Sequence, residues 1–299
     1  MEFCNLSEVV IRATDTMDDL REKVRLATIL GTLQSTLTNF RYIRAAWKAN
    51  CEEERLLGQS MTGIVDNELT NGRKSGLEER LKELKQIAID TNAEWAKMLG
   101  INPATAITAV KPSGTVSQLV NAGSGIHARN SKWGIRTFRA DKKDPVSQMM
   151  IDHGFPYEDD VMAPDSTYVF SFPIKAPKGA ICKNDMNAIE QLELWLMYQR
   201  HWCEHKPSCT ISVKEPEWLQ VGSWVYDHFD EMSGISFLPY DDHVYKQAPF
   251  QECTKEEYEE MVKKMPTDGK WDKLYRYESS DQTIGSQELA CSSGSCDLI

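Results

Sequence analysis

AITAVKPSGTVS, residues 106–117, is the stretch of sequence that most constrains the fold. Its first five residues, Ala106 to Val110, form a short strand-like run. The segment Lys111-Pro112-Ser113-Gly114 interrupts that run, and a helical pattern begins shortly after it. A strand, a glycine-containing loop and a helix in this order predict one β-to-α unit.

The sequence on either side of this unit alternates between two periodicities. Apolar residues at helical spacing predict helices over 76–100, with Gly100 as the stop, and over 188–203. Strand-like runs follow at 167–174, 210–213 and 234–238. Strands that alternate with helices predict an α/β fold.

The segment 16–50 is expected to be mostly helical, because its apolar residues recur at helical spacing and no proline interrupts it. We interpret these apolar positions as core: Leu20, Val24, Leu26, Ile29, Leu30 and Leu33.

The loop that follows Val110 has the composition of a phosphate-binding turn. Gly114 allows the backbone to approach an anion, and a following helix offers free N–H groups. The hydroxyls of Ser113, Thr115 and Ser117 can donate hydrogen bonds. The terminal Gly-Lys-Ser/Thr of a Walker A loop is missing, and an ordinary β-to-α turn with a capping serine is the open alternative.

The end of the chain carries two cysteines, Cys291 and Cys296, in a polar segment beyond Tyr277 that we expect to be mobile. Four small or flexible residues separate them, so the pair can close into a disulfide and move as a unit. An exposed, flexible pair suits thiol–disulfide exchange. Half of a metal site, or two incidental cysteines, is the alternative.

Two other cysteine-containing segments are ambiguous by themselves. Cys4 lies in the strand-like run Phe3–Val10, where a buried structural cysteine is the default interpretation. His201, Cys203, His205 and Cys209 have residue types that bind zinc, but they lie where a helix is expected to end. We therefore predict no metal there and keep a zinc-stabilised structural subunit as an alternative.

Composition restricts the possible partners. The 299 residues carry a formal charge of -11, which disfavours broad binding to nucleic-acid polymers or anionic membranes. The sequence shows no apolar run long enough for a membrane span and no secretory signal, so a cytoplasmic location is expected. Eight cysteines are too sparse for a secreted disulfide scaffold, and any paired cysteines should be redox-active.

Three motifs taken in order resemble ribonucleotide reductase. They are Phe-Cys-Asn-Leu at 3–6, Val-Lys-Pro-Ser-Gly-Thr-Val-Ser at 110–117 and Glu-Leu-Ala-Cys-x4-Cys at 288–296. Gly-Ile-His-Ala-Arg at 125–129 and Arg-Ala-Asp-Lys at 139–142 are similar to the adenosylcobalamin-dependent ribonucleoside-triphosphate reductases. The resemblance covers essentially the whole chain.

The resemblance implies a role for each motif. In this family a thiyl radical removes the ribose 3′ hydrogen, and a cysteine pair supplies the two electrons that replace the 2′ hydroxyl. Cys4 matches one member of that pair, and Cys291 and Cys296 match the tail pair that a thioredoxin or glutaredoxin recharges. The loop that holds the phosphates of a ribonucleoside di- or triphosphate matches Pro112, Ser113, Gly114, Thr115, Val116 and Ser117.

The resemblance also implies a missing part. The family's Asn-x-Cys-x-Glu motif precedes Phe-Cys-Asn-Leu, and this chain begins after it. We therefore expect residues 1–276 to form the carboxy-terminal half of a ten-stranded α/β barrel, with residues 277–299 as a mobile dithiol tail. An amino-terminal chain would complete the enzyme. Either the gene is split just before Cys4, as Met1 favours and as is known in bacteriophages, or the chain is an excised fragment.

The expected radical source is adenosylcobalamin. The sequence has no Tyr-Tyr pair of the kind used by the iron-dependent class, and its end offers a dithiol tail in place of a glycyl radical site. A non-catalytic nucleotide-binding subunit remains the alternative to a reductase.

Overall fold

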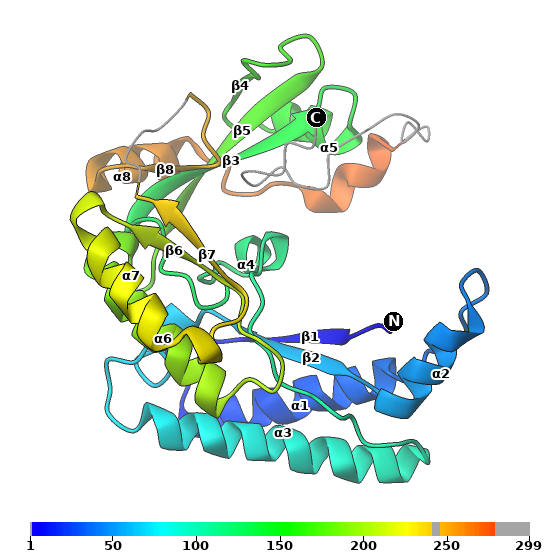
Figure 1. Cartoon of the computed structure of the whole chain (residues 1–299). Helices are drawn as coiled ribbons and strands as arrows, with labels where there is room; N and C mark the ends of the chain where they lie inside the picture. The colour runs from blue at the N-terminus through cyan, green and yellow to red at the C-terminus, as the bar shows by residue number, and fades with distance from the viewer. Residues whose placement is uncertain (1, 241–245, 279–299) are drawn as a thin grey trace. The chain divides into compact units, whose positions relative to one another are not determined.

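The computed structural model describes residues 2–240 and 246–278, and it divides into two compact units (Figure 1). Of the described residues, the first unit comprises 2–129 and 177–240, and the second comprises 130–176 and 246–278. The tail cysteines Cys291 and Cys296 lie outside the described residues.

The first unit contains parallel strands with helices between them, as the α/β prediction requires. Its strands are β1 (Asn5–Val10), β2 (Leu57–Thr62), β6 (Cys209–Val213) and β7 (Ile235–Pro239). Its helices are α1 (Met17–Gln34), α2 (Ala45–Glu54), α3 (Leu77–Leu99), α4 (Thr115–Leu119), α6 (Ala188–His201) and α7 (Trp218–Asp227). Short 3-10 turns cover Ile64–Asp66, Lys183–Asp185, Glu215–Glu217 and Phe229–Glu231.

The run 106–110 joins the two strand pairs of this unit. β1 is parallel to β2, with Asn5 opposite Leu57, and β6 is parallel to β7. The run connects to β2 through the parallel bridge Gln59–Thr108 and to the segment before β6 through Val110–Pro207. Five extended segments therefore follow one another in parallel, although 106–110 pairs through isolated bridges and is not a full strand.

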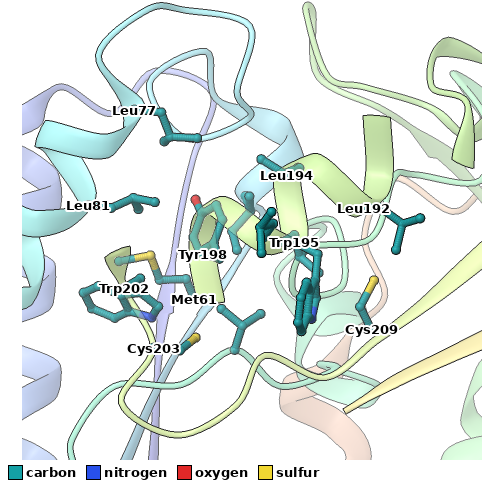
Figure 2. Close-up of a cluster of buried hydrophobic side chains, with 14 of the residues drawn as sticks. Met61, Leu77, Leu81, Leu192, Leu194, Trp195, Tyr198, Trp202, Cys203 and Cys209 are labelled. Carbon is teal, nitrogen blue, oxygen red and sulfur yellow. The ribbon is translucent and has the colours of Figure 1, made fainter. Parts of the chain in front are cut away.

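The core of the first unit lies between this parallel array and its helices. Figure 2 shows part of it, with Trp195, Tyr198 and Trp202 fully buried on and just after α6. The indole N–H groups of Trp195 and Trp202 donate to the carbonyls of Pro207 and Ala109, at 2.9 and 2.8 Å. α6 therefore anchors the run 106–110 to β6 through both apolar contact and satisfied polar groups.

The segment 16–50 is mostly helical, as predicted, but it holds two helices, because α1 ends at Gln34 and α2 begins at Ala45. Thr16 caps α1 in a capping box with Asp19, as the sequence allows, but the helix ends at Ser35. The Ser35 hydroxyl bonds back to the carbonyl of Thr32, and the Arg55 guanidinium donates to the carbonyl of Ser35 at 2.6 Å. Hydroxyl residues that satisfy the last carbonyls end a helix without proline or glycine.

The interpretation of the apolar stripe of α1 is partly wrong. Leu20 and Val24 are fully buried, whereas Leu26, Leu30 and Leu33 are exposed. The buried stripe continues through Thr28, Gly31 and Thr32 instead. Threonine hydroxyls can be buried there because each bonds to the carbonyl four residues earlier in the helix.

The second unit is built on a four-stranded antiparallel sheet in the order β4-β5-β3-β8. Its strands are β3 (Trp133–Asp141), β4 (Tyr157–Asp159), β5 (Thr167–Lys175) and β8 (Phe250–Glu252). Its helices are α5 (Pro145–Asp152) and α8 (Lys255–Lys264), with a 3-10 segment at Trp271–Arg276. A small core forms around Ala140, Met150, Phe155 and Phe170.

The remaining predictions about architecture fall into two groups. The helices over 76–100 and 188–203 and the strands over 167–174, 210–213 and 234–238 are confirmed within one or two residues. The full ten-stranded barrel and the division into a half-barrel and a tail stay predictions. Among the helices of the described residues, none has the length and apolar character to cross a membrane.

Candidate active site

The open face of β1 carries the candidate site. Side chains alternate between the two faces of a strand, and in β1 Ser7 and Val9 are buried beneath α1. Cys4, Leu6 and Glu8 point to the opposite face, where Leu6 is 56% exposed. At Leu6 this face of β1 is therefore not covered by the helices of the unit.

Cys4 lies at the beginning of this face and is a free, exposed cysteine. It packs beside Gly58 of β2, where an added Cβ would lie 2.7 Å from its Sγ and 2.3 Å from Leu6 Cδ2. Only glycine at position 58 leaves room for the Cys4 thiol. The sulfur is partly enclosed by these neighbours, and this burial raises the thiol pKa, while Lys111 opposes the shift.

A cavity of about 500 Å³ opens next to Cys4. It is lined by residues 3–5 and by the connection between α1 and α2, including Leu37, Phe40 and Tyr42. Phe3 packs against Phe40 and Trp47, with ring centroids 5.1 and 4.8 Å away, which fixes one wall. Cys4 therefore faces a solvent-accessible hollow, in contrast to the buried structural cysteine that composition alone favours.

The predicted phosphate loop follows the run 106–110 and reaches the other end of the same face. Ser113 is buried, and its hydroxyl donates to Glu8 Oε2 at 2.8 Å. Its backbone N–H donates to Ser124 Oγ at 3.0 Å. Burial raises the pKa of Glu8, and the hydrogen bond from Ser113 partly offsets that shift.

The other residues of the loop divide into internal and exposed groups. The buried Ser117 hydroxyl donates to the carbonyls of Ser113 and Gly114, so it closes the turn. Pro112, Gly114, Thr115 and Val116 are exposed. The hydroxyls of Ser113 and Ser117 are thus used within the protein, whereas Thr115 is exposed and the first backbone N–H groups of α4 have no partner within the helix.

A buried ion pair holds the segment that follows this loop. No sequence pattern had indicated this pair. Arg129 makes a bidentate pair with Asp66, Nε to Oδ1 at 2.6 Å and Nη2 to Oδ2 at 2.8 Å, with side-chain exposures of 10% and 2%. Asp66 also accepts from the N–H of Gly123 at 2.9 Å, and Arg129 donates to Asn121. We call residues 121–129 the platform.

The platform is also fixed to β2 and β6. Thr62 at the end of β2 accepts from the N–H of Gly125 at 2.9 Å. Gly125 has a φ of +55°, and an added Cβ would lie 2.6 Å from the carbonyl oxygen of Lys111. His127 accepts from the N–H of Thr210 on β6 at its Nε2, at 2.9 Å, and its Nδ1 faces the carbonyl of Ser124 at 2.9 Å.

These two partners define the protonation state of His127. A carbonyl requires a proton on Nδ1, and a backbone N–H requires a lone pair on Nε2, so the ring is neutral. Burial lowers its pKa, in agreement with that assignment. His127 thus connects β6 to Ser124, which in turn holds Ser113.

The structure therefore brings Cys4 and the loop 112–117 to one face of one strand. Cys4 and Glu8 are four residues apart, which corresponds to roughly 13 Å along a strand. The hydrogen bond from Ser113 to Glu8 is where the loop meets β1. No sequence signal in the strand had indicated Glu8.

The residues at 201–209 whose side chains could bind zinc each have another partner or are buried in the core. His205 Nε2 donates to the carbonyl of Leu57 at 2.7 Å, and His201 Nδ1 lies 3.8 Å from Glu78. Cys203 and Cys209 are buried in the core shown in Figure 2, and burial raises the pKa of Cys209 to about 12. Across residues 2–240 and 246–278, no three metal-binding side chains form a group that could hold an ion.

Comparisons with known proteins identify the relatives of this chain. No protein-family model matches it. It is 30% identical over 273 residues to the adenosylcobalamin-dependent ribonucleoside-triphosphate reductase of Euglena gracilis, which covers 90% of this chain and 36% of the relative. The reductase of the same name from Lactobacillus leichmannii is 28% identical, covering 99% of this chain and 44% of the relative.

The fold has a solved counterpart. A crystal structure described as a B-12 dependent (class II) ribonucleotide reductase superposes with a TM-score of 0.79 and 24% identity, over 94% of this chain and 42% of that chain. The chain thus spans less than half the length of the reductases that it matches. By its similarity to these relatives over 90–99% of its length, the chain fits a partial sequence of an adenosylcobalamin-dependent, class II ribonucleotide reductase.

Proposed function

We propose that this chain is one part of a two-chain ribonucleotide reductase and supplies a reducing cysteine, the substrate phosphate loop and a dithiol tail. The observation that carries the proposal is the open face of β1, which has Cys4 at one end and Ser113 bonded to Glu8 at the other. The similarity to these reductases gives the reaction class, and the spacing of about 13 Å fits a nucleotide laid along the strand.

The redox step balances with one partner thiol. Cys4 and a second cysteine on the rest of the reductase are oxidised together to a disulfide. Their two electrons and two protons reduce the ribose carbon and release its 2′ hydroxyl as water. Cys291 and Cys296 then reduce that disulfide by thiol–disulfide exchange, and a thioredoxin or glutaredoxin recharges the tail pair.

The loop 112–117 contributes binding and not chemistry. Thr115 is exposed and the first N–H groups of α4 have no partner within the helix, so they can donate to phosphate oxygens of a ribonucleoside di- or triphosphate. Because the platform fixes Ser113 through Ser124, the loop needs little rearrangement when the nucleotide binds.

Adenosylcobalamin would supply the radical in the proposed enzyme, and the names of the relatives describe those proteins as adenosylcobalamin-dependent. The described cavity beside Cys4, about 500 Å³, has the size of a pocket for a drug-sized molecule. We therefore assign none of the described residues to the cofactor and expect its site on the complementary chain. That chain would carry Asn-x-Cys-x-Glu and complete the ten-stranded barrel, of which residues 1–276 are the carboxy-terminal half.

The unpaired edge of β1 supports a hetero-complex. Within the described residues β1 pairs only with β2, so one row of its backbone donors and acceptors has no strand partner. Such an edge favours pairing with another strand. We expect the complete enzyme to act in the cytoplasm, which is the host's cytoplasm if the gene is split and carried by a bacteriophage.

The test is co-expression of this chain with a polypeptide that carries Asn-x-Cys-x-Glu, followed by an assay of deoxyribonucleotide formation. We expect turnover only with both chains and adenosylcobalamin present. Cys291→Ser and Cys296→Ser should stop multiple turnover with thioredoxin but leave the first turnover intact. Nucleotide binding by this chain without any turnover of the pair would instead indicate a non-catalytic binding subunit.

A further inference from the structure

Two lysines approach a single tyrosine ring at the carboxyl edge of β6 and β7. Lys214 follows β6, and Tyr240 follows β7, directly after the paired residues Val213 and Pro239. The ammonium of Lys214 lies 5.3 Å from the centroid of the Tyr240 ring, and that of Lys183 lies 5.1 Å from it. The lysines come from segments 31 residues apart in the sequence, so the fold brings them together.

The tyrosine itself is held firmly. Its hydroxyl donates to Asn184 Oδ1 at 2.6 Å, and its backbone N–H donates to the carbonyl of Val213 at 2.7 Å. The ring is therefore fixed by a bond at each end. It attracts both ammonium groups.

The charge of this cluster is not balanced by the parts of the chain that the structure places. Lys183 and Lys214 are half-buried, and no carboxylate among those residues lies within 4 Å of either ammonium. Lys142 provides a contrast in the second unit, because it lies 4.4 Å from the Tyr168 ring and also pairs with Asp159. A half-buried pair of cations without a nearby anion favours the binding of an anion.

A second contrast shows that two lysines near a ring are not sufficient. Lys132 and Lys175 lie 6.0 and 4.6 Å from the Trp133 ring, but both lysines are exposed to water. Solvent screens their charges, so they require no counter-ion. Partial burial therefore distinguishes the cluster at Tyr240 from the one at Trp133.

The position of the cluster connects it with the phosphate loop. The N–H of Lys183 donates to the carbonyl of Arg129 at 2.8 Å, and Arg129 is the residue that pairs with Asp66 and holds the platform. The carboxyl edge of parallel strands is also where α/β proteins bind ligands. Both features place the cluster on the side of the unit where the platform supports the loop.

We infer that Lys183, Lys214 and Tyr240 form an anion site for an oligophosphate group, separate from the loop 112–117. The ligand class is a nucleoside triphosphate or another oligophosphate, because two cations about 5 Å from one ring suit an extended multivalent anion. The site needs no thiol chemistry, so it stands independently of the proposed reductase activity.

The first experiment is lysine footprinting of the full chain with an acetylating reagent, with tripolyphosphate as the probe. At tenfold excess over its Kd, tripolyphosphate should slow acetylation of Lys183 and Lys214 by about tenfold. Lys132 and Lys175 serve as internal controls, and their rates should not change. Equal protection of all four lysines, or none, would overturn the inference.

The second experiment measures affinity by calorimetry at low salt. Lys183→Gln combined with Lys214→Gln should weaken tripolyphosphate binding by at least about tenfold, which corresponds to about 1.4 kcal/mol. Lys132→Gln combined with Lys175→Gln is the matched control and should bind like the wild type. Wild-type affinity in the first double variant would contradict the site, and the footprint decides if that variant does not fold.

Stoichiometry separates the two possible sources of the phosphate. If the cluster holds the outer phosphates of the nucleotide already bound at the loop, one triphosphate binds per chain and Ser113→Ala weakens it. If the cluster takes a separate nucleotide, two bind per chain and Ser113→Ala affects one of them.

Discussion

The two ends of the open face of β1 differ in how completely the protein encloses them. At the Cys4 end, the thiol faces a cavity of about 500 Å³ and is a free, exposed cysteine. At the Glu8 end, Ser113 is buried and belongs to a network that continues through Ser124 and His127 to β6. The same strand thus offers an accessible end and a preorganised end.

This difference follows from what each end has to do. A thiol that exchanges with other thiols must be reached by them, so burial would make it inert. A loop that holds phosphates gains affinity when its geometry is fixed before the ligand arrives. We therefore expect changes at the Cys4 end to affect turnover without affecting stability, and changes behind the loop to affect stability first.

Replacement of Cys4 should have the largest effect. Cys4→Ser removes a thiol that must supply electrons, so we expect turnover of the assembled enzyme to fall at least about a thousandfold. The free energy of unfolding should change by less than about 0.5 kcal/mol, because the residue is exposed. Cys253→Ser in the second unit is the control and should retain wild-type turnover.

The buried ion pair behind the loop should give the largest effect on stability. Asp66→Asn leaves Arg129 without its carboxylate, and we expect a loss of about 3–5 kcal/mol in urea unfolding. Glu231→Gln removes a pair of the same bidentate geometry with Arg200 at the surface, so it should cost at most about 1 kcal/mol. Equal losses in the two variants would show that the platform does not depend on Asp66.

A glycine of the platform provides a backbone test. Gly125→Ala would place a Cβ 2.6 Å from the Lys111 carbonyl oxygen, at a residue with a positive φ. We therefore expect the free energy of unfolding to fall by about 1–3 kcal/mol. Gly222→Ala is the control, because its site in α7 is open and alanine favours helix by about 0.5–1 kcal/mol. If both substitutions stabilise the chain in urea unfolding, Lys111 and the platform are not in close contact.

The smallest expected effect is the pH dependence that His127 introduces. Its pKa is lowered in the folded chain, so the unfolded chain binds more protons once the pH falls below about 6.5. The stability that neutral His127 provides is present above that pH and is lost as the pH falls through the folded pKa. His127→Gln should therefore lose less stability than the wild type between pH 8 and pH 5.5, as measured by urea unfolding at both values.

The elements that sequence reasoning predicted are those with strong local signals. α3 has a helical apolar stripe and ends at Gly100, and α6 has a capping box at Asn187. β2 was missed because Leu-Gly-Gln-Ser-Met-Thr has no strand pattern, being buried on both faces. Its strand conformation depends on pairing with β1 and with 106–110, which are distant in the sequence.

The candidate site divides in the same way. Cys4 and the loop 112–117 were predictable because motifs that are contiguous in sequence mark them. Asp66 and Arg129 are 63 residues apart, and Ser113 and Glu8 are 105 residues apart, so only the folded topology brings them together. The same holds for Lys183 and Tyr240, which no local pattern connects.

The measurement that tests the central claim most directly is protection of Cys4 by nucleotide. The assembled enzyme is alkylated with iodoacetamide, and the rate at Cys4 is followed by peptide mass spectrometry with and without a ribonucleoside triphosphate. If one nucleotide lies along the open face of β1, the triphosphate should slow alkylation of Cys4, and Ser113→Ala should reduce that protection at the same nucleotide concentration. An unchanged alkylation rate at Cys4 while the nucleotide is demonstrably bound would contradict the account.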